Sequence, residues 1–149
     1  MSEQEQQDKE KQPAEKLAEE KKDKLGNSIP LRILIAEDNL INQKLISRIF
    51  SSLGYEVDVA DNGVIALDHM ENKSYELVTL DIQMPEMDGI TCAKEIHKKY
   101  GDERPVLVSI TANIQLLQED ISKDGMDDVI TKPFRADDLK NIILKWFGK

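Results

Sequence analysis

Five short apolar runs, each followed by an amphipathic stretch, dominate the sequence from Ile29 onward. The runs have the length of buried strands, and the stretches between them carry apolar residues at helical spacing. The predicted strands cover residues 31–36, 56–60, 76–82, 105–111 and 127–132. The predicted helices cover residues 40–53, 63–73, 90–101, 114–125 and 136–147. Such alternation indicates an α/β fold, in which right-handed crossovers place helices on both faces of a parallel sheet.

Residues 1–28 have a different composition from the rest of the chain. They are mainly Gln, Glu, Lys and Asp, and Leu17, Ala18 and Leu25 are their chief apolar residues. A segment of this kind buries too little surface to offset the entropy lost on ordering. We therefore expect a charged, disordered tail over 1–28 and a single domain over 29–149. The alternative is a helix beginning at Pro13 that serves as a coiled-coil or docking segment.

Charge and cysteine content narrow the function classes. The formal net charge of -9 disfavours nucleic acid, because binding a phosphate backbone requires clustered Lys and Arg. The single cysteine, Cys92, excludes an internal disulfide, fits a reducing compartment and is expected to be a small core residue. The polar N-terminus and the lack of a long apolar run argue against a signal peptide and a membrane span. We expect a cytoplasmic protein.

Acidic residues close two of the predicted strands. Glu37 and Asp38 follow the first strand, and Asp81 lies at the end of the third. In a flavodoxin-like, doubly wound (βα)5 sheet with strand order 2-1-3-4-5, these strands are neighbours, and ligands bind beyond their carboxyl ends. Converging carboxylates raise one another's pKa unless a cation lies among them. Magnesium, with manganese as the alternative, suits such oxygen ligands.

Two further residues complete a pattern that suits phosphoryl transfer. Lys132 ends the fifth predicted strand and offers an ammonium, and Thr111 ends the fourth and offers a hydroxyl. A carboxylate nucleophile, a metal, a lysine and a hydroxyl together can bind and transfer a phosphoryl group. A single carboxylate at a strand end is more often a helix cap. The prediction therefore depends on all five residues falling at carboxyl ends of strands.

Four segments, RILIAEDN, LVTLDIQMPEMDG, VSITAN and DDVITKPF, occur in order between about Pro30 and the C-terminus. Together they resemble the receiver domain of two-component response regulators, especially receivers of hybrid histidine kinases and phosphorelays. The resemblance implies that Asp81 is the phosphoacceptor. It implies that Glu37, Asp38 and Asp81, with the main-chain carbonyl of Gln83, hold magnesium. The donor would be a phosphohistidine on a histidine kinase or a histidine phosphotransfer protein.

The resemblance also assigns a switch. Thr111 matches the hydroxyl that turns toward the phosphoryl group, and Lys132 matches the phosphate-contacting lysine, whose bond to Pro133 is expected to be cis. The family usually has Tyr or Phe three residues before this lysine, whereas this chain has Val129. That departure removes the usual aromatic half of the switch, but not the phosphorylation chemistry. We expect a monomer or weak dimer, either a stand-alone receiver or a fragment of a longer chain.

Three other function classes compete. A pseudo-receiver would be an interaction module with an unused phosphosite, but Asp81, Thr111 and Lys132 are intact. An aspartyl-phosphate hydrolase of the haloacid dehalogenase type generally has a second acid where this chain has Gln83. In a flavodoxin-like redox protein, the carboxylates would repel a flavin phosphate. His69 and His97 lie in amphipathic helices and are expected on solvated faces.

Overall fold

The computed structural model describes residues 24–112 and 125–148. Within them, five parallel strands form one sheet in the order β2-β1-β3-β4-β5. The strands are β1 (Ile33–Ala36), β2 (Val57–Ala60), β3 (Leu77–Asp81), β4 (Val106–Thr111) and β5 (Asp128–Thr131). The predicted fold class and strand order are confirmed.

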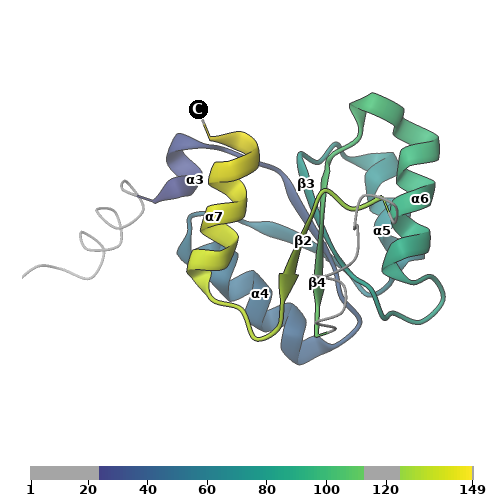
Figure 1. The fold of residues 1–149 in the computed structure, drawn as a ribbon, viewed down its shortest axis with the longest axis horizontal. Coiled ribbons are helices and arrows are strands. Elements are labelled where there is room, and N and C mark those ends of the chain that lie inside the picture. Colours follow the sequence, from purple (N-terminus) through teal and green to yellow (C-terminus); the bar gives the residue numbers. More distant parts are fainter. Residues whose placement is uncertain (1–23, 113–124, 149) are drawn as a thin grey trace, which may run out of the picture.

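Helices cover both faces of the sheet. On one face lie α4 (Leu40–Ser52) and α7 (Ala136–Phe147), and on the other lie α5 (Gly63–Asn72) and α6 (Gly89–Tyr100) (Figure 1). A short 3-10 turn, η1 (Gly101–Glu103), follows α6. The helix predicted over 114–125 falls almost entirely outside the described residues. Of the helices in the described part of the chain, none is long and apolar enough to cross a membrane.

The two covered faces of the sheet explain why its central strands are buried along almost their whole length. Alternate residues of a strand point to opposite faces, and both faces of a doubly wound sheet are covered. Leu34 accordingly packs in the core beneath α5 and α6, whereas Ile33 and Ile35 pack with Phe50 beneath α4 and α7. Every residue of β1 and β3 is buried.

Strand register brings the acidic residues to one level of the sheet. Ala36 of β1 pairs with Leu80 of β3. Glu37, which directly follows β1, therefore lies level with Asp81 at the end of β3. The edge formed by these strand ends is where a doubly wound sheet reverses its winding and binds ligands.

The short helix α3 (Leu25–Ser28) lies inside the range expected to be a solvated tail. Its contacts differ from that expectation. The amide of Gly26 donates to the carbonyl of Leu53 at 2.8 Å, and the side chains of Leu25 and Ile29 pack against the core beneath α4 and α7. No periodic pattern of residues 24–29 predicts this contact, because it depends on single residues. Residues 1–23 lie outside the described part.

Candidate functional site

A crevice of about 590 Å³ opens at the carboxyl ends of β1, β3 and β4. It combines side chains from four segments that are distant in the sequence. The lining residues are Glu37, Asp38, Asn39, Asn42, Asp81, Gln83, Thr111, Ala112 and Lys132. All five residues that the strand-end argument singled out are among them.

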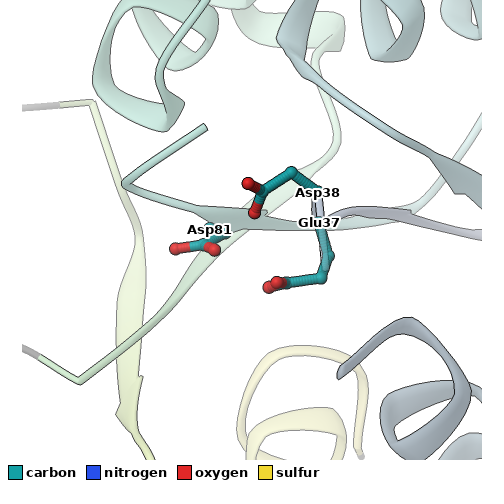
Figure 2. Close-up of side chains that lie close together, drawn as sticks. All are labelled: Glu37, Asp38 and Asp81. Atoms are coloured by element: carbon teal, nitrogen blue, oxygen red, sulfur yellow. The ribbon is translucent and has the colours of Figure 1, made fainter. Parts of the chain in front are cut away.

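Three carboxylates converge in this crevice. Glu37, Asp38 and Asp81 each offer an oxygen, and these oxygens lie within 4.8 Å of one another. Figure 2 shows the three side chains pointing toward the same space from the ends of β1 and β3. Three hard oxygen donors at this separation suit a small divalent cation such as Mg²⁺. The donor set therefore fits the predicted metal.

Glu37 is almost completely buried, with 1% of its surface exposed. Its Oε1 accepts hydrogen bonds from the main-chain amide of Asn39 and from Nδ2 of Asn42, each at 3.2 Å. Its Oε2 lies 3.4 Å from Nζ of Lys132. A buried charge is tolerated only when it is paired and hydrogen-bonded, and Glu37 meets both conditions.

Asp81 lies beside Glu37 in a less enclosed position. Its Oδ1 accepts from the main-chain amide of Gln83 at 3.2 Å, and its Oδ2 lies 3.7 Å from Nζ of Lys132. Burial, followed by the neighbouring Glu37, raises the pKa of Asp81 to about 6, and Lys132 and the Gln83 amide oppose that rise. A cation among the carboxylates would favour the charged form of Asp81.

The loop after β3 brings the start of α6 close to the backbone of Asp81, and the first residue of that helix is a glycine, Gly89. A Cβ on Gly89 would lie 2.4 Å from the carbonyl oxygen of Asp81, so only glycine fits there. The amide of Gly89 donates to the carbonyl of Ile82 at 3.0 Å, and Asp88 caps α6 by accepting from the amide of Thr91 at 2.7 Å. This loop fixes the backbone on which Asp81 and Gln83 sit.

Thr111 and Lys132 enter the crevice from β4 and from the loop after β5. The amide of Lys132 donates to the carbonyl of Thr111 at 2.7 Å, which holds the two chain segments together. The bond between Lys132 and Pro133 is cis, as expected. Val129 pairs with Ser109 of β4, two positions before the pair formed by Thr131 and Thr111.

Several polar residues of the site were not singled out from the sequence. Asn39 caps α4 by accepting from the amides of Ile41 and Asn42, and an Asn before an apolar helical run is a recognisable cap signal. Asn42 and Gln43 gave no such signal, because their role depends on contacts with the ends of β1 and β2.

The other residues considered from the sequence lie away from the crevice. His97 is hydrogen-bonded through Nε2 to the carbonyl of Gly125 at 2.8 Å and is partly buried, so it is not a freely solvated residue. Cys92 is buried, as expected, and burial raises the pKa of its thiol to about 12.

Comparisons with known proteins point to one family. Residues 33–144 match the family described as the response regulator receiver domain. Over 140 residues, the chain is 37% identical to histidine protein kinase 1 of Candida albicans, an alignment that covers 83% of this chain and 6% of that protein. The chain thus spans only a small part of the length of the curated relatives that it matches.

Solved structures of receiver domains are also similar to this chain. The receiver domain of the sensor histidine kinase PA1611 from Pseudomonas aeruginosa, which has a magnesium ion coordinated in its active site cleft, is 32% identical with a TM-score of 0.72. That match covers 80% of this chain and 98% of the other. A second match is to a co-crystal structure from Saccharomyces cerevisiae of the histidine phosphotransfer protein Ypd1 with the receiver domain of Ssk1. It has 25% identity and a TM-score of 0.70, and covers 80% of this chain and 90% of that one.

Proposed function

Because the chain belongs to the response regulator receiver family, we propose that Asp81 is its phosphoacceptor residue. The observation that carries this assignment is the convergence of three carboxylates and one ammonium, Lys132, at the carboxyl ends of the strands. Asp81 is the most central of the three acids, because it ends the middle strand of the sheet. Donors would be a phosphohistidine on a histidine kinase or a histidine phosphotransfer protein.

The crevice also suits a divalent cation. Glu37, Asp38 and Asp81 would hold Mg²⁺, with Mn²⁺ as the alternative, and the main-chain carbonyl of Gln83 would complete the protein ligands. When bound, the cation supplies positive charge that offsets the carboxylates and the incoming phosphate. We expect phosphorylation to require this cation, because three carboxylates and a phosphoryl group repel one another in one crevice unless positive charge compensates them.

The residues of the chain have separate tasks in the transfer. A carboxylate oxygen of Asp81 forms the new bond to phosphorus while the bond from phosphorus to the donor imidazole breaks, and the imidazole nitrogen leaves with the bonding electron pair. Lys132, which lies within 4 Å of both Glu37 and Asp81, can turn to pair with a phosphoryl oxygen. The Thr111 hydroxyl can donate to another. The domain would thus catalyse its own phosphorylation and dephosphorylation without being a conventional enzyme.

Helix α4 offers a docking face for the phosphodonor. It begins two residues after Asp38, at the rim of the crevice, and its exposed apolar residues are Leu40 at 67%, Ile41 at 77% and Leu45 at 47%. Exposed apolar residues gathered in this way mark interaction sites. Lys44 and Arg48 are exposed on the same helix, so the face suits a partner with an acidic rim. The likeness to the Ssk1 receiver that was crystallised with Ypd1 supports a histidine phosphotransfer protein as this partner.

A labelling experiment tests the assignment of Asp81. The full chain is incubated with acetyl phosphate and Mg²⁺, and its intact mass is measured. The wild type should gain one phosphoryl group, excess EDTA should prevent the gain, and Asp81→Asn should show none. Asp88→Asn, in the same loop, is the matched control because Asn keeps the helix cap. Labelling of Asp81→Asn at the wild-type level would refute the assignment, and an unlabelled wild type would favour a pure interaction module.

A further inference from the structure

Gln43 is a buried polar residue of α4 that lies beside the acidic residues. It is 8% exposed, and its Nε2 lies 2.6 Å from the carbonyl oxygen of Glu37 and 2.8 Å from Oδ1 of Asp61. A side-chain amide nitrogen has two hydrogens, and here each meets an acceptor. A main-chain carbonyl and an ionised carboxylate can only accept, so chemistry fixes which end of the amide faces them.

These bonds connect the ends of β1 and β2. The amide of Glu37 donates to the carbonyl of Ala60 at 3.0 Å, and its own carbonyl is held through Gln43 to Asp61, the residue after Ala60. Both polar groups of the Glu37 main chain are therefore tied to the end of β2. The Glu37 carbonyl belongs to the peptide unit that leads into Asp38, so its orientation sets the direction in which Asp38 leaves the strand.

We infer that Gln43 is a positioning residue, which holds the Glu37–Asp38 peptide so that the acidic pair is ready for a divalent cation. This inference rests on the proposed function, because it concerns the same metal site. The Glu37–Asp38 peptide needs to be held in place because the three carboxylates repel one another when no cation is bound. Groups that orient metal ligands commonly change metal affinity by about 10- to 100-fold when removed.

The chain offers substitutions that separate the hydrogen bonds from packing. In Gln43→Met, the methionine side chain is about as long as that of glutamine and suits a buried position, but it makes neither hydrogen bond. Gln43→Glu keeps the shape but directs an acceptor at two acceptors. Asp61→Asn and Asp61→Ala both remove the charge of Asp61, and only Asn keeps an oxygen that can accept from Gln43. Ser52→Ala is the control, because it removes a side-chain hydrogen bond of 2.6 Å to Ile49 at the far end of the same helix.

Two measurements on the full chain test the inference. The first is the Mg²⁺ dissociation constant, from titration followed by NMR. Gln43→Met should raise it by about 10-fold or more, and Gln43→Glu further, whereas Ser52→Ala should leave it unchanged. The second is hydrogen exchange of the Glu37 amide in EDTA. Exchange should accelerate in Gln43→Met more than in Ser52→Ala, because the Glu37 peptide is no longer held.

The Asp61 variants provide an independent test should Gln43→Met fail to fold. Asp61→Ala should bind Mg²⁺ more weakly than Asp61→Asn, because only Asn keeps an oxygen that can accept from Gln43. Equal affinities for the two Asp61 variants, or a dissociation constant for Gln43→Met within twofold of the wild type, would overturn the inference. If the wild type itself binds no Mg²⁺, it is the proposed function that fails.

Discussion

Lys132 and Glu37 form an ion pair across the candidate site, with 3.4 Å between Nζ and Oε2. The Glu37 side chain is 1% exposed, whereas that of Lys132 is 23% exposed. The buried carboxylate depends on this ammonium, which is also 3.7 Å from Asp81. The lysine thus has two roles, since it stabilises the buried carboxylate of Glu37 and is available to an incoming phosphoryl group.

Replacing Lys132 with Met should therefore destabilise the metal-free domain. Breaking a buried ion pair costs about 3–5 kcal/mol, and because Lys132 is partly exposed we expect about 2 kcal/mol in the free energy of unfolding. Mg²⁺ should restore part of the loss by supplying positive charge beside Glu37. Urea unfolding with and without Mg²⁺ measures both effects. Lys140→Met, on the exposed side of α7, is the control, and an equal loss in both variants would contradict this role of Lys132.

The docking face on α4 predicts a variant with normal chemistry and poor phosphotransfer. Ile41→Glu places a charge at the centre of the exposed apolar residues, and loss of a central interface contact costs about 2 kcal/mol, or about 30-fold in affinity. Transfer from a phosphorylated histidine phosphotransfer protein should slow accordingly, while labelling by acetyl phosphate stays at the wild-type rate. Leu144→Glu, an exposed apolar residue of α7, should transfer normally. Equal transfer by wild type and Ile41→Glu would exclude this face.

The contact between α3 and the end of α4 predicts that the domain begins near Lys24. A Cβ on Gly26 would lie 2.2 Å from the carbonyl oxygen of Gly54, so Gly26→Ala must displace α3. We expect a loss of about 1–3 kcal/mol, as for other overpacked contacts. A chain beginning at Lys24 should melt within a few degrees of the full chain, whereas one beginning at Ile29 should melt lower. Identical melting of the two shortened chains would show that α3 contributes nothing.

The ion pair between Arg104 and Asp127 predicts a pH dependence of stability. Asp127 accepts from Nη1 of Arg104 at 2.7 Å and from the amide of Leu107 at 2.8 Å. Burial works against the charged form, but the bonds from Arg104 and Leu107 lower the pKa of Asp127 overall. A lowered pKa stabilises the fold above the unfolded pKa of about 3.9, and the contribution is lost as the pH falls through the folded value.

Asp127→Asn should therefore reduce the free energy of unfolding by about 1–2 kcal/mol between about pH 5 and 7. The difference from the wild type should begin to shrink below about pH 3.9, where the unfolded chain binds a proton, and should disappear once the pH has fallen through the lowered pKa of folded Asp127. Glu71→Gln is the control, because it breaks an exposed pair with Lys99 and should cost under about 0.5 kcal/mol. A difference that stays constant down to pH 2 would show that the charge of Asp127 is not what stabilises the domain.

Fold and acidic site were largely predictable because both follow from local patterns. The alternation of apolar runs gave the strands to within a residue or two, and strand ends located Glu37, Asp81 and Lys132 before any contact was known. The links between Gln43 and Asp61, and between Gly26 and Leu53, were not predictable. The first link spans 18 positions of the sequence and the second spans 27. Each depends on how the strands and helices pack, and Gln, Asp, Gly and Leu occur in too many structural roles for their presence alone to predict such a contact.

The position of Val129 carries the last prediction, which concerns how phosphorylation is signalled. Val129 pairs with Ser109, and paired residues of neighbouring parallel strands face the same side of a sheet. Thr111 faces that side too, two residues further along β4. In relatives with an aromatic residue at this position, the ring can fill the space that the threonine hydroxyl vacates when it turns toward the phosphoryl group. Val129 is small and stiff at χ1, so it has little to move.

We therefore expect a switch that runs through Thr111 and the strands β4 and β5 without an aromatic rotamer change. Beryllofluoride with Mg²⁺ serves as the phosphoryl mimic, and backbone amide shifts are followed by NMR. Thr111→Ala should leave labelling of Asp81 largely intact but reduce the shifts beyond the crevice, since a ligand biases two states only through contacts that differ between them. Val129→Tyr should enlarge those shifts if the missing ring limits coupling, and Val129→Ile is its control. Distant shifts that are unchanged in Thr111→Ala would place the switch in another residue while leaving the phosphoacceptor assignment intact.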